Sequence, residues 1–266
     1  MTPWLIVLSL LGLVAGSHFV PTPDEVRASF KQAQKFYAAE DYEQAIQTYE
    51  RINRIESPLL YTAEIVAEVG EIDAPIKEIA LYQTGNSHLK RGEENQHRAS
   101  RIRDSERKQE YGERAAADFE RAAAYFVRTE KEASSAQLKG LARNRLINTL
   151  YESKDYDRTV EEGRVFLELY PDSGFLVNVL YNIGWAHYDA DRYEQSIEAF
   201  KDLIHHFPRG YRADRALFQI GEAYYKRELY GDAVPWYQDV VDRLDIGQMS
   251  ERDLLKMRRE KMAGLV

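Results

Sequence analysis

The six histidines are the residues best able to do acid–base or metal chemistry in this chain, because cysteine is absent. They are His18, His88, His97, His187, His205 and His206. No two of them have the two-to-four-residue spacing that often brings a pair of imidazoles onto one metal ion. The adjacent pair at 205–206 ends a predicted helix, where a cationic ring interacts favourably with the helix dipole. The sequence therefore predicts no metal site.

Other catalytic signatures are also missing from the sequence. Without cysteine there is no disulfide, thiolate nucleophile, Cys-ligated zinc or iron–sulfur cluster. The segment Asp189-Ala-Asp191 resembles half a calcium loop, but the required glycine and distal glutamate are absent. No phosphate-binding loop, dinucleotide-binding glycine motif, HExxH or GxSxG is present. We therefore expect a non-enzymatic protein without a cofactor.

Net charge and composition exclude further classes. The chain carries 36 Lys and Arg against 44 Asp and Glu, a net charge of −8, whereas a nucleic-acid binder needs a basic face. Hydrophobic residues make up 44% of the 266 positions, which is too many for a disordered chain. Only 8 prolines and 15 glycines interrupt it, and this favours long helices.

An internal repeat of 37 residues organises the second half of the chain. Tyr156, Tyr193 and Tyr230 are in register, as are Gly184 and Gly221. Three further series share the period: Leu146, Ile183 and Ile220; Tyr151, Tyr188 and Tyr225; Val160, Ile197 and Val234. A further copy, YEQAIQTY, lies at 42–49. Coincidence at many positions of one period predicts stacked supersecondary units.

Each copy reads as two amphipathic helices joined by a short turn, for example 216–229 and 230–241. Gly184 lies in the middle of a first helix, where glycine costs about 1 kcal/mol relative to alanine. We expect close approach of the second helix to compensate for this cost. Ser196 would supply the opposing small surface, and Phe200 would fill the groove between neighbouring units.

The pattern small–x3–aromatic on the second helix, followed by Pro171 or Pro208, resembles the tetratricopeptide repeat over 141–243 and 26–56. The phrases LYNIGWAHY and FKDLIHHFP resemble a narrower group of bacterial envelope proteins. That group is typified by the Tol–Pal-associated cell-division coordinator and the lipoprotein of the outer-membrane β-barrel assembly machine. The anchoring cysteine and the coiled coil of these proteins are missing here. The resemblance thus implies an all-α, right-handed solenoid of antiparallel helix pairs and an envelope setting, without a specific role.

The domain organisation follows from this repeat. We expect a signal peptide or anchor at 1–17, a helix pair at 24–56, an irregular repeat at 57–135, an array at 136–245 and a closing segment at 246–266. The repeats of the array fall near 140–172, 177–209 and 214–243. The closing segment is either a capping helix or the first helix of a truncated repeat.

The middle of the chain departs from the repeat. Residues 78–93 read as a first helix with Gly85 as its small residue, and 113–126 read as its second helix. The intervening segment 93–110 has almost no apolar face, so we expect both helices to lengthen into a charged hairpin. This hairpin is either a solvated helix pair with i,i+4 ion pairs or a partner-binding arm. A short extra helix at 58–69 and a helix start at 73–75 are also expected.

The first residues read as an export signal. Residues 4–16 are nearly all apolar, and Ala15-Gly16-Ser17 matches a cleavage pattern, although no Lys or Arg precedes the apolar run. The alternative is an uncleaved inner-membrane anchor over residues 4–20. Either interpretation predicts an exported, periplasmic protein whose only membrane contact is this segment.

The face of the first helices is the expected binding surface, because tetratricopeptide arrays bind partner proteins or peptides in their concave groove. The candidate residues are Asn144, Asn148, Tyr151, Tyr181, Trp185, Tyr188, Phe218, Glu222, Tyr225 and Lys226. Trp185 is the strongest candidate, because the aligned positions Asn148 and Glu222 are polar. The alternative for the tyrosines at 151, 188 and 225 is packing of one repeat on the next. The structural-subunit alternative assigns partner binding to the charged hairpin and the convex face.

Overall fold

The computed structural model describes residues 21–62, 65–70 and 72–245, and these residues form an all-α solenoid as the repeat predicts. The helices are α2 (Pro23–Ala38), α3 (Tyr42–Asn53), α4 (Ile76–Arg101), α5 (Ser105–Glu132), α6 (Ala136–Glu152), α7 (Tyr156–Leu169), α8 (Leu176–Asp189), α9 (Tyr193–His206), α10 (Tyr211–Lys226) and α11 (Tyr230–Asp245). The expected signal or anchor at 1–17 and closing segment at 246–266 lie outside the described residues.

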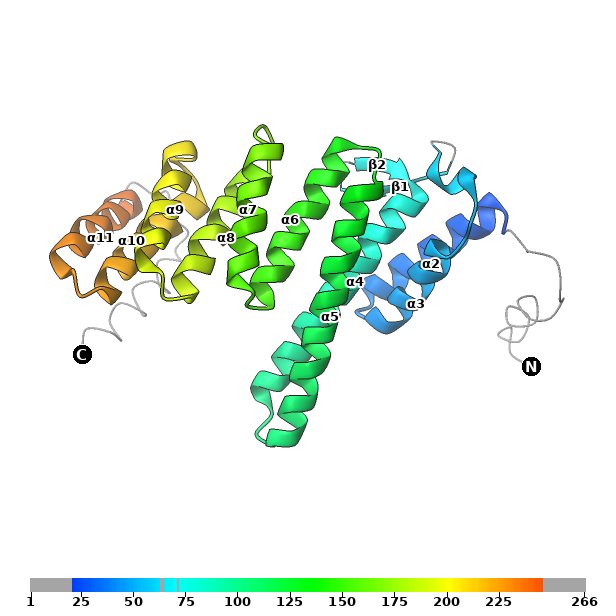
Figure 1. Cartoon of the computed structure of the whole chain (residues 1–266), viewed down its shortest axis with the longest axis horizontal. Coiled ribbons are helices and arrows are strands. Elements are labelled where there is room, and N and C mark those ends of the chain that lie inside the picture. The colour runs from blue at the N-terminus through cyan, green and yellow to red at the C-terminus, as the bar shows by residue number, and fades with distance from the viewer. Residues whose placement is uncertain (1–20, 63–64, 71, 246–266) are drawn as a thin grey trace.

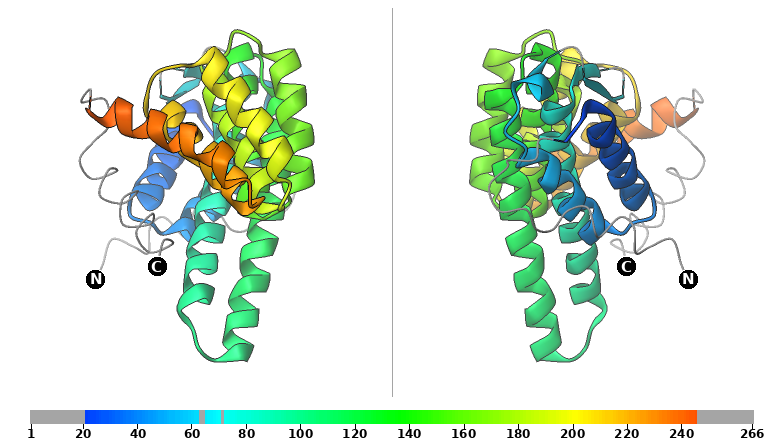
Figure 2. Two further views of the ribbon diagram at one scale, coloured as in Figure 1. Left: turned by 90° about the vertical axis from the view of Figure 1, so that its left-hand side faces the viewer. Right: turned by 90° about the vertical axis from the view of Figure 1, so that its right-hand side faces the viewer.

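The helices pair in sequence order, and the pairs stand side by side in a row (Figure 1). The end views in Figure 2 show the hairpin of α4 and α5 projecting away from the row. No helix within the described ranges has both the length and the apolar character that a bilayer span requires.

Glycines set the close approach of the two helices in a pair. A Cβ atom added at Gly184 would lie 2.5 Å from the Phe200 ring, and one added at Gly221 would lie 2.7 Å from the Tyr237 ring. The Ser196 hydroxyl also donates a hydrogen bond of 2.9 Å to the Gly184 carbonyl. The mid-helix glycines therefore compensate for their cost through packing, as the sequence predicts.

The turns inside the pairs repeat one arrangement. A tyrosine near the end of the first helix contacts the tyrosine that begins the second, with ring centroids 5.4 Å apart for Tyr188 and Tyr193. The same contact occurs at Tyr37–Tyr42, Tyr151–Tyr156 and Tyr225–Tyr230. The tyrosine series thus packs within each pair. Tyr151 also reaches the next pair, because its hydroxyl donates to Asp189 at 2.6 Å.

The long charged insertion is a continuation of the same helix packing. Helices α4 and α5 contain 26 and 28 residues, against 14 in each of α8 and α9. An added Cβ at Gly85 would meet the Phe126 ring at 2.8 Å, and one at Gly92 would meet the Phe119 ring at 2.8 Å. The glycine–aromatic contact therefore occurs twice, seven residues apart, along this hairpin.

The segment before α4 differs from the expected short helix at 58–69. Among the described residues of that range, only Pro58–Tyr61 is helical, as the 3-10 turn η1. Val66–Val69 (β1) pairs antiparallel with Ile72–Pro75 (β2). Gly70, with a φ of 60°, lies in the connecting turn, where a side chain would be strained. Val66, Val69 and Ile72 are β-branched and favour a pleated strand over a helix. The helix start predicted at 73–75 is confirmed at its last residue, because Pro75 is the N-cap of α4, although Asp73 and Ala74 belong to β2.

Candidate functional site

The ten residues of the predicted binding surface all lie on first helices, and we call this set the first-helix face. Asn144, Asn148 and Tyr151 are on α6; Tyr181, Trp185 and Tyr188 are on α8; Phe218, Glu222, Tyr225 and Lys226 are on α10.

Trp185 belongs to an aromatic cluster and is not an isolated exposed ring. Its centroid lies 6.1 Å from that of Tyr181, 5.6 Å from that of Tyr188 and 6.2 Å from that of Phe200. All three contacts have the edge-to-face geometry that aromatic pairs prefer. The side chain is half-buried, so it retains surface that a partner can contact.

The rest of the first-helix face varies in accessibility. Asn144 and Phe218 are each only 9% exposed, so they offer little surface to a partner. Glu222 accepts a 2.6 Å hydrogen bond from the Tyr237 hydroxyl within its own helix pair. Tyr225 and Lys226 are exposed near the end of α10. The most accessible part of this face therefore lies at the C-terminal repeat.

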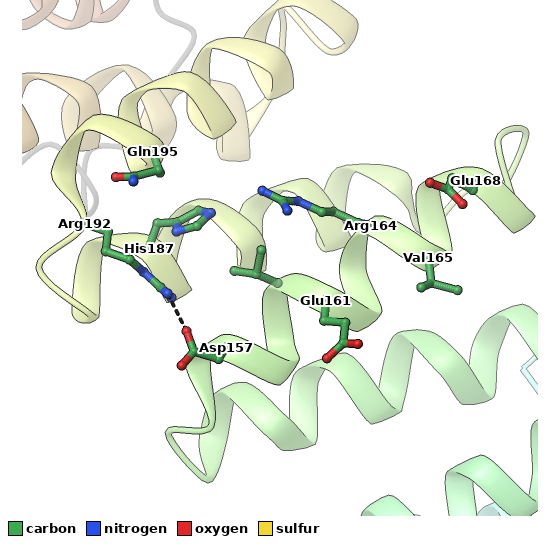
Figure 3. Close-up of a pocket in the computed structure, with 9 residues that line it drawn as sticks. Asp157, Glu161, Arg164, Val165, Glu168, His187, Arg192 and Gln195 are labelled. Atoms are coloured by element: carbon green, nitrogen blue, oxygen red, sulfur yellow. Dashed lines mark hydrogen bonds and ion pairs between the residues drawn. The ribbon is translucent and has the colours of Figure 1, made fainter.

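A second site, not predicted from the sequence, lies between the second helices of two adjacent pairs. This α7–α9 groove has a volume of about 470 Å³. It is lined by Asp157, Val160, Glu161, Arg164, Val165, Glu168, His187, Arg192 and Gln195 (Figure 3). Six of these residues fall on one face of α7, because their spacing follows the helical period. It is thus formed mainly by elements other than those of the first-helix face.

The repeat geometry positions the two residues at the base of this groove. An added Cβ at Gly163 of α7 would lie 2.7 Å from Ile183, so α7 and α8 approach closely one turn before His187. In the following turn the Arg192 N–H donates a 2.9 Å hydrogen bond to the His187 carbonyl. This bond holds the backbone of Arg192 next to the end of α8, close to His187.

Several polar atoms in the groove have no hydrogen-bond partner within the described part of the chain. The Arg192 Nη1 atom forms an ion pair with Asp157, which is 84% exposed. The Arg192 Nε and Nη2 atoms and the His187 Nδ1 atom are buried without a partner. Donors of this kind are costly to leave unsatisfied in a protein interior.

The electrostatic environment of His187 keeps the ring neutral. Burial, together with the positive charges of Arg192 and Arg164, lowers the pKa of His187 to about 4, and the Asp157 carboxylate opposes this only in part. At neutral pH the ring therefore carries no charge and can donate one hydrogen bond from Nδ1 in the appropriate tautomer. The groove therefore offers hydrogen-bond donors beside two arginines, Arg164 and Arg192, in a lining that also holds three carboxylates.

The 37-residue register contained a signal for this site. His187 aligns with Leu150 and Tyr224, so a polar ring replaces a larger apolar or aromatic group. Arg192 aligns with Asp155, whose side chain accepts a hydrogen bond from the Arg158 N–H and caps α7. Helix α9 has no such side-chain cap. His187 thus breaks the repeat pattern, and such departures are expected at functional positions. The position of Arg192 has no common residue, because the next repeat carries Leu229 there.

A cluster of buried polar side chains lies at the base of the hairpin, and we call it the Asp118 cluster. Asp118 is 2% exposed and accepts hydrogen bonds from Arg91 at 2.6 and 2.9 Å and from Asn95 at 3.3 Å. His88 Nδ1 lies 3.0 Å from the same carboxylate, and Arg91 also pairs with Glu43 of α3. Burial alone would raise the pKa of Asp118, but the His88 and Arg91 contacts outweigh it and lower that pKa. This cluster ties the N-terminal pair to the hairpin.

The potential metal-ligand side chains are dispersed over the described residues. Across residues 21–62, 65–70 and 72–245, no three His, Asp or Glu side chains come together as a potential ligand set. His205 and His206 end α9 as expected, and the His206 ring lies 2.8 Å from the Asp202 carbonyl. The two sites on the array offer aromatic surface and hydrogen-bond donors, which are suited to binding.

Comparisons with known proteins agree with this fold. The family model described as Tetratricopeptide repeat matches residues 181–247, from within α8 to the end of the array. The fold is similar to that of MamA from Desulfovibrio magneticus RS-1 (residues 41 to the end), with a TM-score of 0.56, 15% identity, and coverage of 87% of this chain and 100% of that one. It is also similar to MamA AMB-1, with a TM-score of 0.51, 16% identity, and coverage of 88% and 98%. No match was found among curated proteins.

Proposed function

We propose that this chain is a non-enzymatic scaffold that binds segments of partner proteins through its helix-pair array. The observation that carries the proposal is the tetratricopeptide match at 181–247, within an array whose first helices present tyrosines and Trp185. Aromatic side chains are enriched at protein interfaces because each supplies a large contact area at a low cost in conformational entropy.

Capture of a partner through Trp185 tests this proposal. A tagged full-length chain is crosslinked in the native cell, and captured proteins are compared with those of Trp185→Ala. Trp236→Ala on α11 is the matched control, because it removes a half-buried tryptophan from a second helix. We expect one partner to be lost with Trp185→Ala and retained with Trp236→Ala. Equal capture by all three folded proteins would reject the first-helix face as the binding surface.

A second candidate function is a structural subunit that makes contact through the α4–α5 hairpin and the convex face. The projection of this hairpin from the array favours it (Figure 1). Deleting residues 93–110 shortens the hairpin but keeps Gly85 and Phe126, whose contact joins its base. Loss of capture in this deletion, with full capture by Trp185→Ala, would assign partner binding to the hairpin.

The cell envelope is the proposed location, on the strength of the apolar segment at 4–16 and the cleavage pattern that follows it. Fractionation of the native cell tests this, with mass spectrometry of the mature N-terminus. A periplasmic chain that begins near Ser17 supports a cleaved signal, whereas an intact N-terminus in the inner membrane supports an anchor. Recovery of the intact chain in the cytoplasm would overturn both.

A further inference from the structure

We propose that the α7–α9 groove binds a carboxylate, supplied by an aspartate or glutamate side chain of a bound protein segment. The source of the carboxylate rests on the scaffold function proposed above. The binding chemistry rests only on the groove itself. It would give the array a recognition point separate from the first-helix face.

The first argument is the set of unpaired donors. The Nε and Nη2 atoms of Arg192 form one edge of a planar guanidinium, and two parallel hydrogen bonds from such an edge match the two oxygens of a carboxylate. His187 Nδ1, at the base of the groove, provides a third position for a bond to the same group. His187 is only 6% exposed, so this nitrogen has little access to solvent.

The second argument is the local field. The positive charges of Arg192 and Arg164 act on the His187 ring, and the Asp157 carboxylate opposes them. Asp157 is largely exposed and already pairs with Nη1 of Arg192. A carboxylate bound beside His187 would therefore interact favourably with both arginines, although Glu161 and Glu168 also line the groove.

The shape and rim of the groove favour a carboxylate over a phosphate. Val160 and Val165 supply apolar wall against which the aliphatic stem of an acidic side chain can pack. Glu161 and Glu168 also line the groove and would repel a dianion more strongly than a single negative charge. One carboxylate on a short apolar stem therefore fits best.

The third argument is that the chain gives up stabilising features at these positions. The aligned Leu150 is a buried apolar residue, and the aligned Asp155 caps its helix. With His187 and Arg192 in their places, α9 has no side-chain cap and buried donors have no partner. An acceptor from a bound protein would satisfy those donors.

Access to the donors requires a small movement. The Arg192 Nε and Nη2 atoms are covered in the groove, although the side chain as a whole is 32% exposed. Rotation of this side chain about its stem, with its ion pair to the exposed Asp157 opening, would turn the donor edge toward an entering carboxylate. The exposed position of Asp157 makes this pair weak and easily exchanged.

A small-molecule titration tests the binding chemistry without any partner. The full chain, with 15N-labelled arginine, is titrated at pH 7 with propionate, and the Nε–H signals are followed by NMR. The neutral isostere propionamide and inorganic phosphate are titrated in parallel. We expect a saturable shift of the Arg192 signal with propionate, no shift with propionamide, and weaker binding of phosphate.

Two variants assign the effect to the groove. Arg192→Gln should abolish saturable propionate binding, whereas His187→Leu, which introduces the residue found at position 150, should weaken it about tenfold by removing one hydrogen bond to a charged group. The Arg158 Nε–H signal is the internal control, because that side chain lies on the same helix outside the groove.

Three outcomes would overturn the inference. If the shift of the Arg192 Nε–H signal does not saturate with propionate, the groove holds no carboxylate site. If the Arg158 signal shifts equally, the effect of propionate is not specific to the groove. Tighter binding of phosphate than of propionate would reject the carboxylate assignment. The two proposals can fail independently. If no partner is captured in the cell, the scaffold proposal fails, whereas the propionate titration still tests the binding chemistry of the groove.

Discussion

The Asp118 cluster and the α7–α9 groove combine the same residue types in opposite ways. In the cluster the carboxylate is buried, and arginine, histidine and asparagine side chains converge on it. In the groove the carboxylate of Asp157 is 84% exposed, and the buried atoms are the donors of Arg192 and His187. A buried acceptor surrounded by donors holds two elements together. Buried donors without an acceptor can still form hydrogen bonds with a ligand.

The largest effect is expected for Asp118→Ala. Removing this carboxylate leaves the partly buried Arg91 and the buried His88 without their shared partner, which should lower the free energy of unfolding by about 3–5 kcal/mol. Urea unfolding of the full chain measures it. Glu110→Ala is the control, because its ion pair with Arg114 is exposed and should contribute less than about 1 kcal/mol. Similar decreases in the free energy of unfolding for both variants would show that the Asp118 cluster does not stabilise the fold more than an exposed ion pair does.

The groove should lose stability in acid through His187. The unfolded state binds a proton at His187 near pH 6.5, whereas burial keeps the folded-state pKa at about 4. Stability contributed by the neutral ring is therefore present above pH 6.5 and is lost as the pH falls toward 4, by at most about 3 kcal/mol. Unfolding curves at pH 7 and pH 5 should differ less for His187→Leu than for the natural chain. An unchanged difference would place the acid response elsewhere.

Glycine substitutions sharpen the comparison between the array and the hairpin. Gly184→Ala should destabilise by about 1–3 kcal/mol, because its Cβ would lie 2.5 Å from the Phe200 ring. Gly112→Ala, in the projecting part of α5, meets nothing within 4 Å and should instead stabilise by about 0.5–1 kcal/mol. Thermal unfolding of both variants measures the difference in sign. The same sign for both would contradict close packing at Gly184.

The smallest effect is expected for Arg192→Asn. Asparagine at the position before α9 can cap the helix as Asp155 caps α7, which should raise the free energy of unfolding by about 1 kcal/mol. The same change removes the donor edge, so propionate binding should be lost while stability rises. A variant that is less stable than the natural chain would show that Arg192 has a structural role.

The periodic part of the fold is the part that the sequence predicts well. Tyr193 and Gly184 recur at 37 residues, and the position of Phe200 is again aromatic at Tyr237. Each unit must solve the same packing problem, so the helices of the array and their glycine contacts follow from the register. The extended hairpin was also predictable, because residues 93–110 lack an apolar face yet stand between two helical patterns. The strand pair at 66–75 was not, because four-residue strands carry too short a pattern to distinguish from a helix.

The candidate sites were less accessible to prediction from sequence. The first-helix face was expected from its pattern, but the burial of Asn144 and Phe218 depends on how neighbouring helices pack. The pairing of Asp118 with Arg91 and His88 depends on which turns of α4 and α5 face each other, which an insertion of unknown geometry conceals. His187 was visible as a break in the register, but its proximity to Arg192 follows from the turn that joins α8 and α9.

The length of the hairpin determines how closely a large body can approach the array from one side. At about 1.5 Å per residue, α4 and α5 extend about 40 Å, whereas the 14-residue helices α8 and α9 extend about 21 Å. The hairpin projects from one side of the row (Figure 1), so a flat body approaching from that side touches its tip first. The neighbouring turns are then held roughly 15–20 Å away. On that side we therefore expect slender or flexible segments to reach the array more readily than a flat surface does.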